Sequence, residues 1–171
     1  YRHGGKLVLF GNGGSASDAQ HIVAELVNKF KMDRPMLNAL ALNVNTSVIT
    51  SIANDISYED VFSRQVEHLV DYRDVVIGLS TSGNSKNVIK ALITARNKGA
   101  FVIGFTGNDG GLVKNYVDLL LNIPSDNTPR IQEAHITVGH IVCEIIEKEL
   151  FGKKEWVGFM DAAVFIDRDG V

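Results

Sequence analysis

The chain has 171 residues, of which 45% are hydrophobic and 22% are charged, as is typical of a globular domain with a sizeable core. Its 17 Lys and Arg against 20 Asp and Glu give a formal net charge of −3, which argues against broad binding to the phosphate backbone of a nucleic acid. No apolar run approaches the roughly 20 residues of a membrane span, so a membrane is not an expected partner either. The single cysteine, Cys143, excludes a disulfide framework and a cysteine-rich zinc site, and it predicts a cytoplasmic protein.

Strand and helix patterns alternate along the chain. Short apolar runs predict strands at 6–10, 37–42, 74–79, 101–105 and 117–123. Apolar residues at helical spacing predict helices at 18–31, 46–53, 58–70, 87–98 and 129–150. This alternation indicates an α/β fold, a five-stranded and mostly parallel sheet flanked by helices in a flavodoxin-like or Rossmann-like sandwich. Such sheets bind ligands beyond the carboxyl ends of their strands.

A glycine-rich loop at residues 11–15 follows the first predicted strand and leads into a helix. Glycines let the backbone approach a ligand, and the amides at a helix N-terminus favour anions. A dinucleotide fingerprint does not fit, because Ala16 stands where its third glycine belongs. A P-loop is excluded because the required Gly-Lys-Ser/Thr is missing. A tight turn without a ligand is the alternative for this loop taken alone.

The loop after the third predicted strand is rich in hydroxyl groups. Residues 80–85 contain three serines, a threonine and a glycine, and a helix follows. Hydroxyls and helix-start amides together can hold a phosphate without Lys or Arg. Simple N-capping is the alternative, but a cap needs one hydroxyl and this loop carries four. We therefore expect a phosphate ester to bind here, at the switch point of the sheet.

Two helices carry residues that can bind a metal ion or move a proton. His21 and Glu25 lie four residues apart and share one helix face, which suits a divalent metal or a base with an orienting partner. The last helix carries Gln132, His135 and His140, of which the first and third share a face. Each of these signals has an alternative when it is taken alone. His21 and Glu25 can be a solvent-facing pair, and His135 and His140 can be structural histidines.

The combination of segments 11–21, 53–55, 80–85 and 130–136 resembles the sugar isomerase (SIS) domain family, and most closely its phosphoheptose isomerases. The resemblance covers residues 1–153 in continuous order. It implies an isomerase that interconverts sedoheptulose 7-phosphate and D-glycero-D-manno-heptose 7-phosphate, in heptose synthesis for lipopolysaccharide core or related glycans. It also implies a homotetramer with active sites at subunit interfaces.

The resemblance assigns roles to individual residues. The implied substrate-binding residues are Asn12, Gly13, Ser15, Asn54, Asp55, Ser80, Thr81, Ser82, Ser85 and Gln132. The implied ligands of one Zn²⁺ per site are His21, Glu25, Gln132 and His140. In the implied reaction Glu25 moves a proton through an enediolate, and His140 acts as an acid toward the sugar oxygens. Eight helical residues rise about 12 Å, so Gln132 and His140 meet at one ion only if the helix start is irregular or the site is shared between subunits.

The C-terminal tail carries a second resemblance. Residues 162–170 are similar to the opening of a haloacid dehalogenase-type phosphatase, most specifically a heptose bisphosphate phosphatase, with Asp167 as nucleophile and Asp169 as general acid/base near Mg²⁺. A chance Asp-rich strand is the alternative. The chain starts at Tyr1 without Met or the family's leading helix, so we expect a piece of a longer chain. We expect a SIS domain at 1–153, a linker at 154–160 and the first strand of a truncated phosphatase domain at 161–171.

Two other classes of protein remain as alternatives. A non-catalytic SIS regulator that binds phosphosugars, or an adaptor of the type that associates with the replication initiator, needs the fold and the oligomer but not the metal-site residues. The second alternative is an enzyme with a nucleotide cofactor, and it is supported only by the glycine-rich loop at residues 11–15.

Overall fold

The five predicted strands form one sheet in a computed structural model that describes residues 1–152. The strands are β1 (Leu7–Gly11), β2 (Ala39–Ala41), β3 (Val75–Ser80), β4 (Phe101–Gly107) and β5 (Leu119–Ile123). Their order across the sheet is β2-β1-β3-β4-β5, and each neighbouring pair is parallel. The predicted α/β fold is therefore confirmed, and within the described residues the sheet is parallel throughout.

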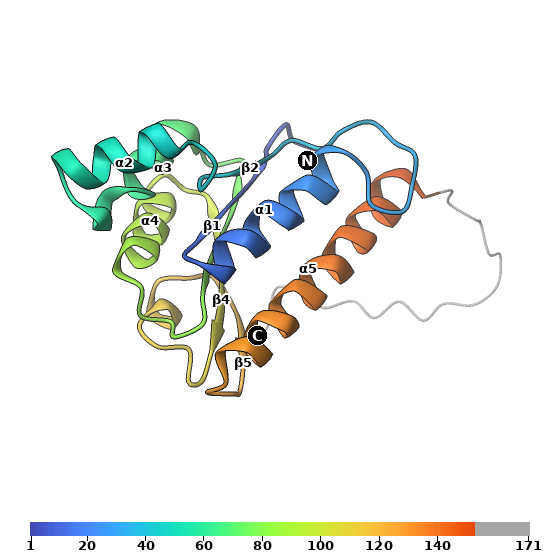
Figure 1. The fold of residues 1–171 in the computed structure, drawn as a ribbon. Helices are drawn as coiled ribbons and strands as arrows, with labels where there is room; N and C mark the ends of the chain where they lie inside the picture. Colours follow the sequence, from blue (N-terminus) through green and yellow to red (C-terminus); the bar gives the residue numbers. More distant parts are fainter. Residues whose placement is uncertain (153–171) are drawn as a thin grey trace, which may run out of the picture.

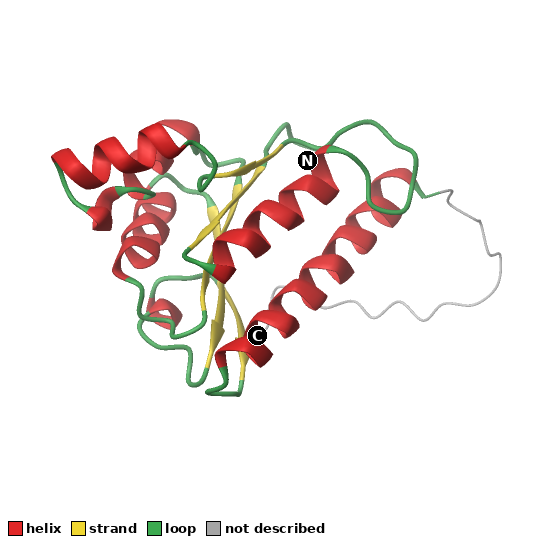
Figure 2. Ribbon diagram, viewed as in Figure 1, coloured by secondary structure: helices red, strands yellow, loops and turns green. Residues whose placement is uncertain are grey.

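Helices cover both faces of this sheet, so the fold has three layers (Figures 1 and 2). The helices are α1 (Gly14–Val27), α2 (Thr46–Asp55), α3 (Ser63–Leu69), α4 (Lys86–Asn97) and α5 (Thr128–Phe151), with 3₁₀ turns η1 (Tyr58–Asp60) and η2 (Val113–Asn115). Figure 1 shows α1 and α5 side by side on one face, and α2, α3 and α4 on the other. No helix within residues 1–152 is long and apolar enough to cross a bilayer.

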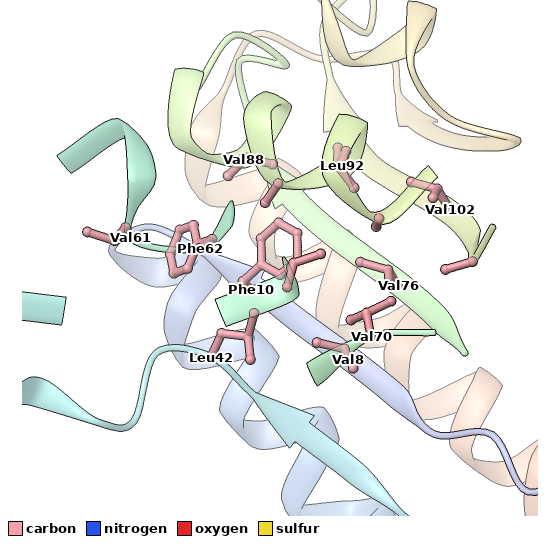
Figure 3. Packing of buried hydrophobic residues seen from close by; sticks show 14 of the residues in the cluster. Val8, Phe10, Leu42, Val61, Phe62, Val70, Val76, Val88, Leu92 and Val102 are labelled. Atoms are coloured by element: carbon pink, nitrogen blue, oxygen red, sulfur yellow. The ribbon is translucent and has the colours of Figure 1, made fainter. Parts of the chain in front are cut away.

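The central strands are buried on both faces, which explains why their sequences are continuous apolar runs rather than alternating ones. Successive side chains of a strand point to opposite faces, so β1 contributes to two cores. Val8 and Phe10 pack under α3 and α4, where Phe10 stacks on Phe62 with ring centroids 5.1 Å apart (Figure 3). Leu7 and Leu9 pack under α1 and α5 in a second buried cluster. Cys143 lies in that second core as a free, buried thiol.

Several predicted helix boundaries are wrong, and side-chain hydrogen bonds explain two of them. The first helix was expected at 18–31 but begins at Gly14 and ends at Val27. It ends early because the backbone N–H groups of residues 30–32 donate to the Glu147 carboxylate instead of to helix carbonyls. The helix expected at 58–70 is broken into η1 and α3, since the Ser57 hydroxyl accepts from Glu59 N and starts a separate 3₁₀ turn.

The strand order places the two candidate loops next to each other. From β1 the chain crosses to β2 on one side, and from β3 it continues to β4 and β5 on the other. The order reverses between β1 and β3, which are paired in parallel, so the loops that follow them emerge side by side. This is the position at which open parallel sheets bind ligands.

Helices α1 and α5 run in the same direction along one face of the sheet. Gly14 of α1 lies beside Gln132 of α5, and Ile22 lies beside Gly139 about two turns further along both helices. A Cβ atom at Gly139 would stand 2.6 Å from Ile22 Cδ1, so the missing side chain permits this close approach. Positions eight residues apart on α1 therefore face positions seven residues apart on α5.

The predictions for the C-terminal tail lie outside the described residues. This applies to the linker at 154–160 and to the strand that carries Asp167 and Asp169. Both stay predictions from the sequence.

Candidate active site

Three of the four predicted metal ligands come together between α1 and α5. Glu25 Oε1 lies 3.1 Å from His21 Nε2, and His140 Nε2 lies 3.4 Å from the same nitrogen. One donor atom from each residue lies within 4.8 Å of the other two, so the group can hold a metal ion. Two imidazole nitrogens at this separation cannot both carry a proton toward each other, so at least one lone pair points into the gap. The His21 side chain is 48% exposed and that of Glu25 24%, which leaves the group open to a ligand.

A buried ion pair holds the segment that follows α1 against this group. The side chains of Arg34 and Glu147 are each 1% exposed, and Arg34 Nε donates to Glu147 Oε1 over 2.9 Å. Arg34 also donates to the carbonyl oxygens of Glu25 and Leu26 at the end of α1. Burial opposes the charge of Glu147, but hydrogen bonds from three backbone N–H groups and from Arg34 outweigh it and lower the pKa of this carboxyl.

The same clamp positions an aromatic ring on the candidate site. Glu147 Oε1 accepts from the backbone N–H of Phe30 over 2.8 Å. The Phe30 ring stacks on the His140 ring, with centroids 5.4 Å apart and planes 22° apart. His140 is thus packed between Phe30 and His21, whose ring it meets edge-on at 4.9 Å.

Gln132, the fourth predicted ligand, lies elsewhere on α5. This helix is continuous from Thr128, so Gln132 and His140 are eight residues apart on one regular helix. The predicted irregular helix start is therefore wrong. The Gln132 amide packs against Gly14, where an added Cβ would stand 2.3 Å from Nε2. This places Gln132 beside the loop at residues 11–15, among the predicted substrate-binding residues rather than beside His140.

The hydroxyl-rich loop after β3 leads directly into α4, as predicted. Ser80 Oγ donates to Ser85 Oγ over 2.9 Å, and this bond closes the loop across its base. Ser80 is 3% exposed, Thr81 and Ser85 are half-buried, and Ser82 is exposed. Ser85 is the residue before the first turn of α4, and its side chain makes no capping bond there. Among the described residues, the backbone N–H groups of Lys86 and Asn87 have no acceptor and are available for an anion, whereas that of Val88 donates to Asn87 Oδ1.

Replacing Gly83 by Ala is expected to destabilise this loop strongly. Gly83 has φ +65°, and an added Cβ would stand 2.2 Å from the carbonyl oxygen of Gly110. The left-handed conformation alone costs about 1–3 kcal/mol for a residue with a side chain, and the backbone clash adds to it. Gly13→Ala is the matched control, because Gly13 has φ +55° and nothing within 4 Å of its Cβ position. Thermal unfolding of both variants measures the difference, and equal midpoints would show that the clash has no effect.

An amide network joins the two loops, and its residues include two that the sequence did not reveal. Asn12 Nδ2 donates to Asn87 Oδ1, and Asn87 Nδ2 donates back to Asn12 Oδ1, each over 2.9 Å. The Tyr58 hydroxyl donates to Asn12 Oδ1 over 3.0 Å. Asn87 is 3% exposed on α4, and Tyr58 lies on η1. Tyr58 and Asn87 lack any local signal, because their partner lies 46 and 75 residues away along the chain.

The remaining predicted residues occupy different positions. Asn54 and Asp55 are exposed at the end of α2, where Asn54 Nδ2 donates to Asp55 Oδ1 over 2.7 Å. Within residues 1–152 no hydrogen bond joins them to the other candidate groups. Ser15 is 4% exposed, while Gly13 is exposed in its loop. His135 is fully buried against the Thr106 carbonyl oxygen at 3.0 Å, and burial lowers the pKa of its ring, so it is a structural residue of the core.

Comparisons with known proteins agree with this geometry. The family model described as "SIS domain" matches residues 1–107. A phosphoheptose isomerase of Clostridium acetobutylicum is 59% identical over 154 residues, which cover 90% of this chain and 79% of that protein. One of Sulfurimonas denitrificans is 55% identical over 152 residues, 89% of this chain and 78% of that protein. The chain belongs to the phosphoheptose isomerase family of SIS-domain proteins.

Solved structures of other phosphoheptose isomerases share the fold. The structure from Francisella tularensis has a TM-score of 0.83 and 37% sequence identity, with 86% of this chain and 78% of that chain covered. The structure from Neisseria gonorrhoeae has a TM-score of 0.81 and 44% identity over the same shares. The predicted SIS fold and family are confirmed by these relatives.

The chemistry open to this candidate site can be stated from its donor atoms. Two imidazole nitrogens and a carboxylate oxygen could hold a metal ion, and this is a set that divalent transition metals take in catalytic sites with an open position. The hydroxyl-rich loop and the start of α4 offer donors to an anion. The network at Asn12 joins the loop after β1 to the start of α4.

Proposed function

We propose that this chain interconverts sedoheptulose 7-phosphate and D-glycero-D-manno-heptose 7-phosphate by moving a proton between adjacent carbons. The observation that carries this is the convergence of His21, Glu25 and His140 on a helix pair that begins beside the phosphate-type loop. A phosphosugar-binding protein without catalysis needs the loop but has no use for a carboxylate held 3.1 Å from an imidazole. The relatives at 59% and 55% identity, named phosphoheptose isomerases, support the same function.

The substrate is proposed to lie across the two loops at the edge of the sheet. Its phosphate binds to the hydroxyls of the loop and to the first amides of α4, through Ser80, Thr81, Ser82 and Ser85. Its sugar oxygens meet the residues at the start of α1 and the nearby Gln132 amide, through Asn12, Gly13, Ser15 and Gln132. Asn54 and Asp55, exposed at the end of α2, are proposed as further contacts with the sugar. This arrangement fixes the phosphate at one end and leaves the carbonyl end free to reach the α1–α5 group.

His21, Glu25 and His140 are proposed to hold Zn²⁺, which when bound supplies a Lewis acid that polarises the sugar carbonyl. Gln132 lies along α5 from His140, so we propose that a Gln132 ligand comes from a second copy of the chain in a homotetramer. Sedimentation of the purified chain tests this assembly. A monomer that retains full metal content would contradict the shared site.

Proton transfer is proposed to use the carboxylate and one imidazole. Glu25 has two oxygens, of which Oε1 faces His21, so the other can take the proton from the carbon next to the carbonyl. An enediolate then forms, and the proton returns to the neighbouring carbon to give the isomeric sugar. His140, held between Phe30 and His21, faces His21 through Nε2, so its other ring nitrogen, Nδ1, carries the proton. It donates this proton to the sugar oxygen on which negative charge develops and takes one back from the neighbouring hydroxyl as that becomes the new carbonyl.

A coupled assay with elemental analysis tests the proposed function. The purified chain is expected to convert sedoheptulose 7-phosphate and to contain zinc in proportion to its active sites. Removal of the metal by a chelator should abolish turnover, and added Zn²⁺ should restore it. Binding of the sugar phosphate without any turnover, at full metal content, would instead support the non-catalytic regulator. The proposal includes a cytoplasmic location and a role in heptose synthesis for lipopolysaccharide core or related glycans.

A further inference from the structure

The amide group of Asn12 has a fixed orientation, and the fold itself determines it. The backbone N–H of Val88 can only donate, and it donates to one atom of the Asn87 amide over 2.9 Å. That atom must therefore be Oδ1, so in the reciprocal pair with Asn12 the Asn87 oxygen accepts and Nδ2 donates. Asn87 is the second residue of α4 and is only 3% exposed, so water cannot take the place of its side chain in these hydrogen bonds.

The orientation passes from Asn87 to Asn12. Asn87 Nδ2 donates to Asn12 Oδ1 over 2.9 Å, and the Tyr58 hydroxyl donates to the same oxygen over 3.0 Å. Both acceptor positions of that oxygen are thus occupied. Asn12 Nδ2 gives one of its two N–H bonds to Asn87 Oδ1. Among the residues that the structure describes, the second N–H has no acceptor, so the only group that Asn12 can offer to a ligand is a donor.

We infer that Asn87 is a positioning residue, which holds the Asn12 amide so that an N–H, and never a carbonyl oxygen, points at the bound sugar phosphate. A donor in this place binds a hydroxyl or carbonyl oxygen and strengthens as negative charge develops on that oxygen. Asn87 also stands two residues after Ser85, so the same contact ties the sugar-facing loop to the phosphate-binding end of α4. This inference rests on the proposed function for the identity of the sugar phosphate.

The substitution Asn87→Asp changes the hydrogen-bonding pattern with little change of shape. A carboxylate can still accept from Val88 N–H and from Asn12 Nδ2, but it cannot donate to Asn12 Oδ1. Two oxygens then face each other, and the Asn12 amide is no longer held in one orientation. We expect kcat/KM for sedoheptulose 7-phosphate to fall about tenfold or more. The new carboxylate also stands at the start of α4 and repels any phosphate there, so the affinity for inorganic phosphate is compared in the neutral variant Asn87→Ala instead.

The comparison of two ligands separates this role from a structural one. Asn87→Ala removes the donor to Asn12 Oδ1 without adding a charge, so kcat/KM and affinity for sedoheptulose 7-phosphate should fall while the affinity for inorganic phosphate stays at the parent value. A general distortion of the start of α4 would weaken both ligands. Asn97→Asp is the matched control, because Asn97 is exposed at the end of the same helix, and it should keep the parent activity.

The measurements are kcat and KM for sedoheptulose 7-phosphate, and calorimetric affinities for sedoheptulose 7-phosphate and for inorganic phosphate, on the full chain and all three variants. Parent-like kcat/KM in both Asn87 variants would overturn the inference. Equal weakening of sugar phosphate and inorganic phosphate in Asn87→Ala would also overturn it. If the parent chain shows no turnover, the proposed function fails. The calorimetric affinities of Asn87→Ala still decide the inference. It then requires that sedoheptulose 7-phosphate binds more weakly than to the parent chain while inorganic phosphate binds equally well.

Discussion

Replacing Glu25 by Gln is expected to reduce turnover of sedoheptulose 7-phosphate by a factor of about 10² or more, because a neutral amide cannot accept the proton that the reaction moves. Binding of the substrate should survive, since the hydroxyl-rich loop and the start of α4 are separate from the α1–α5 group. The size and shape of the side chain are unchanged, and Glu25 is 24% exposed, so the fold should not be affected. Steady-state kinetics and calorimetry on the same preparation measure both quantities.

The controls for this prediction separate the two duties assigned to Glu25. Glu67→Gln makes the same chemical change at an exposed position on α3 and should leave turnover unaltered. Elemental analysis of the Glu25→Gln protein then distinguishes a base from a ligand, because lost turnover at full metal content identifies the base. Unchanged turnover, or loss of substrate binding together with turnover, would refute the role of Glu25 in proton transfer.

The second large effect is expected when Glu147 is replaced, although nothing in the sequence indicates a catalytic or binding role for this residue. Glu147→Ala leaves Arg34 buried without its partner and removes the acceptor of the three backbone N–H groups at residues 30–32. Breaking a buried ion pair in this way costs about 3–5 kcal/mol of unfolding free energy. Phe30 should also lose its position on His140, so activity should fall even where the protein remains folded.

Glu144→Ala is the matched control, because Glu144 lies one turn earlier on α5 and pairs with Lys31 and Lys148 at the surface. Such exposed pairs contribute about 0–1 kcal/mol. Denaturant unfolding as a function of pH sharpens the comparison. The pKa of Glu147 is lowered in the folded chain, so its contribution is complete above the normal carboxyl range and is lost as the pH falls through the folded pKa. A Glu147→Ala protein as stable as Glu144→Ala would contradict this account.

The sequence predicted the sheet well, because buried strands depend on local patterns. Buried parallel strands appear as short apolar runs, and the loops after two of them carry the glycine and serine clusters that mark a ligand edge. The pair His21 and Glu25 was visible from helical spacing, and His140 from its place on the last helix. Helix ends were predicted less well, because the hydrogen bonds of Ser57 and Glu147 override the periodic pattern.

What the sequence did not reveal are contacts between residues distant along the chain. In the sequence, nothing distinguishes Asn87 from other residues at a helix start, or Glu147 from other charged residues on an exposed helix face. Their burial, 3% and 1% exposed, depends on elements 75 and 113 residues away. The position of Gln132 likewise follows from the packing of α5 on Gly14, a contact that the spacing of apolar residues along the sequence cannot predict.

The pairing of α1 with α5 has a consequence for the order in which the candidate metal-binding group is assembled. His21 and Glu25 are made early in synthesis, whereas His140 arrives only with the last described helix, more than a hundred residues later. Until α5 packs beside it, α1 has only the sheet as a partner, and the candidate ligand set has two members on one helix. Contacts between distant segments form late and at an entropic cost. If this group holds a metal ion, metal uptake therefore marks completed folding, because the full ligand set exists only once α5 lies against α1.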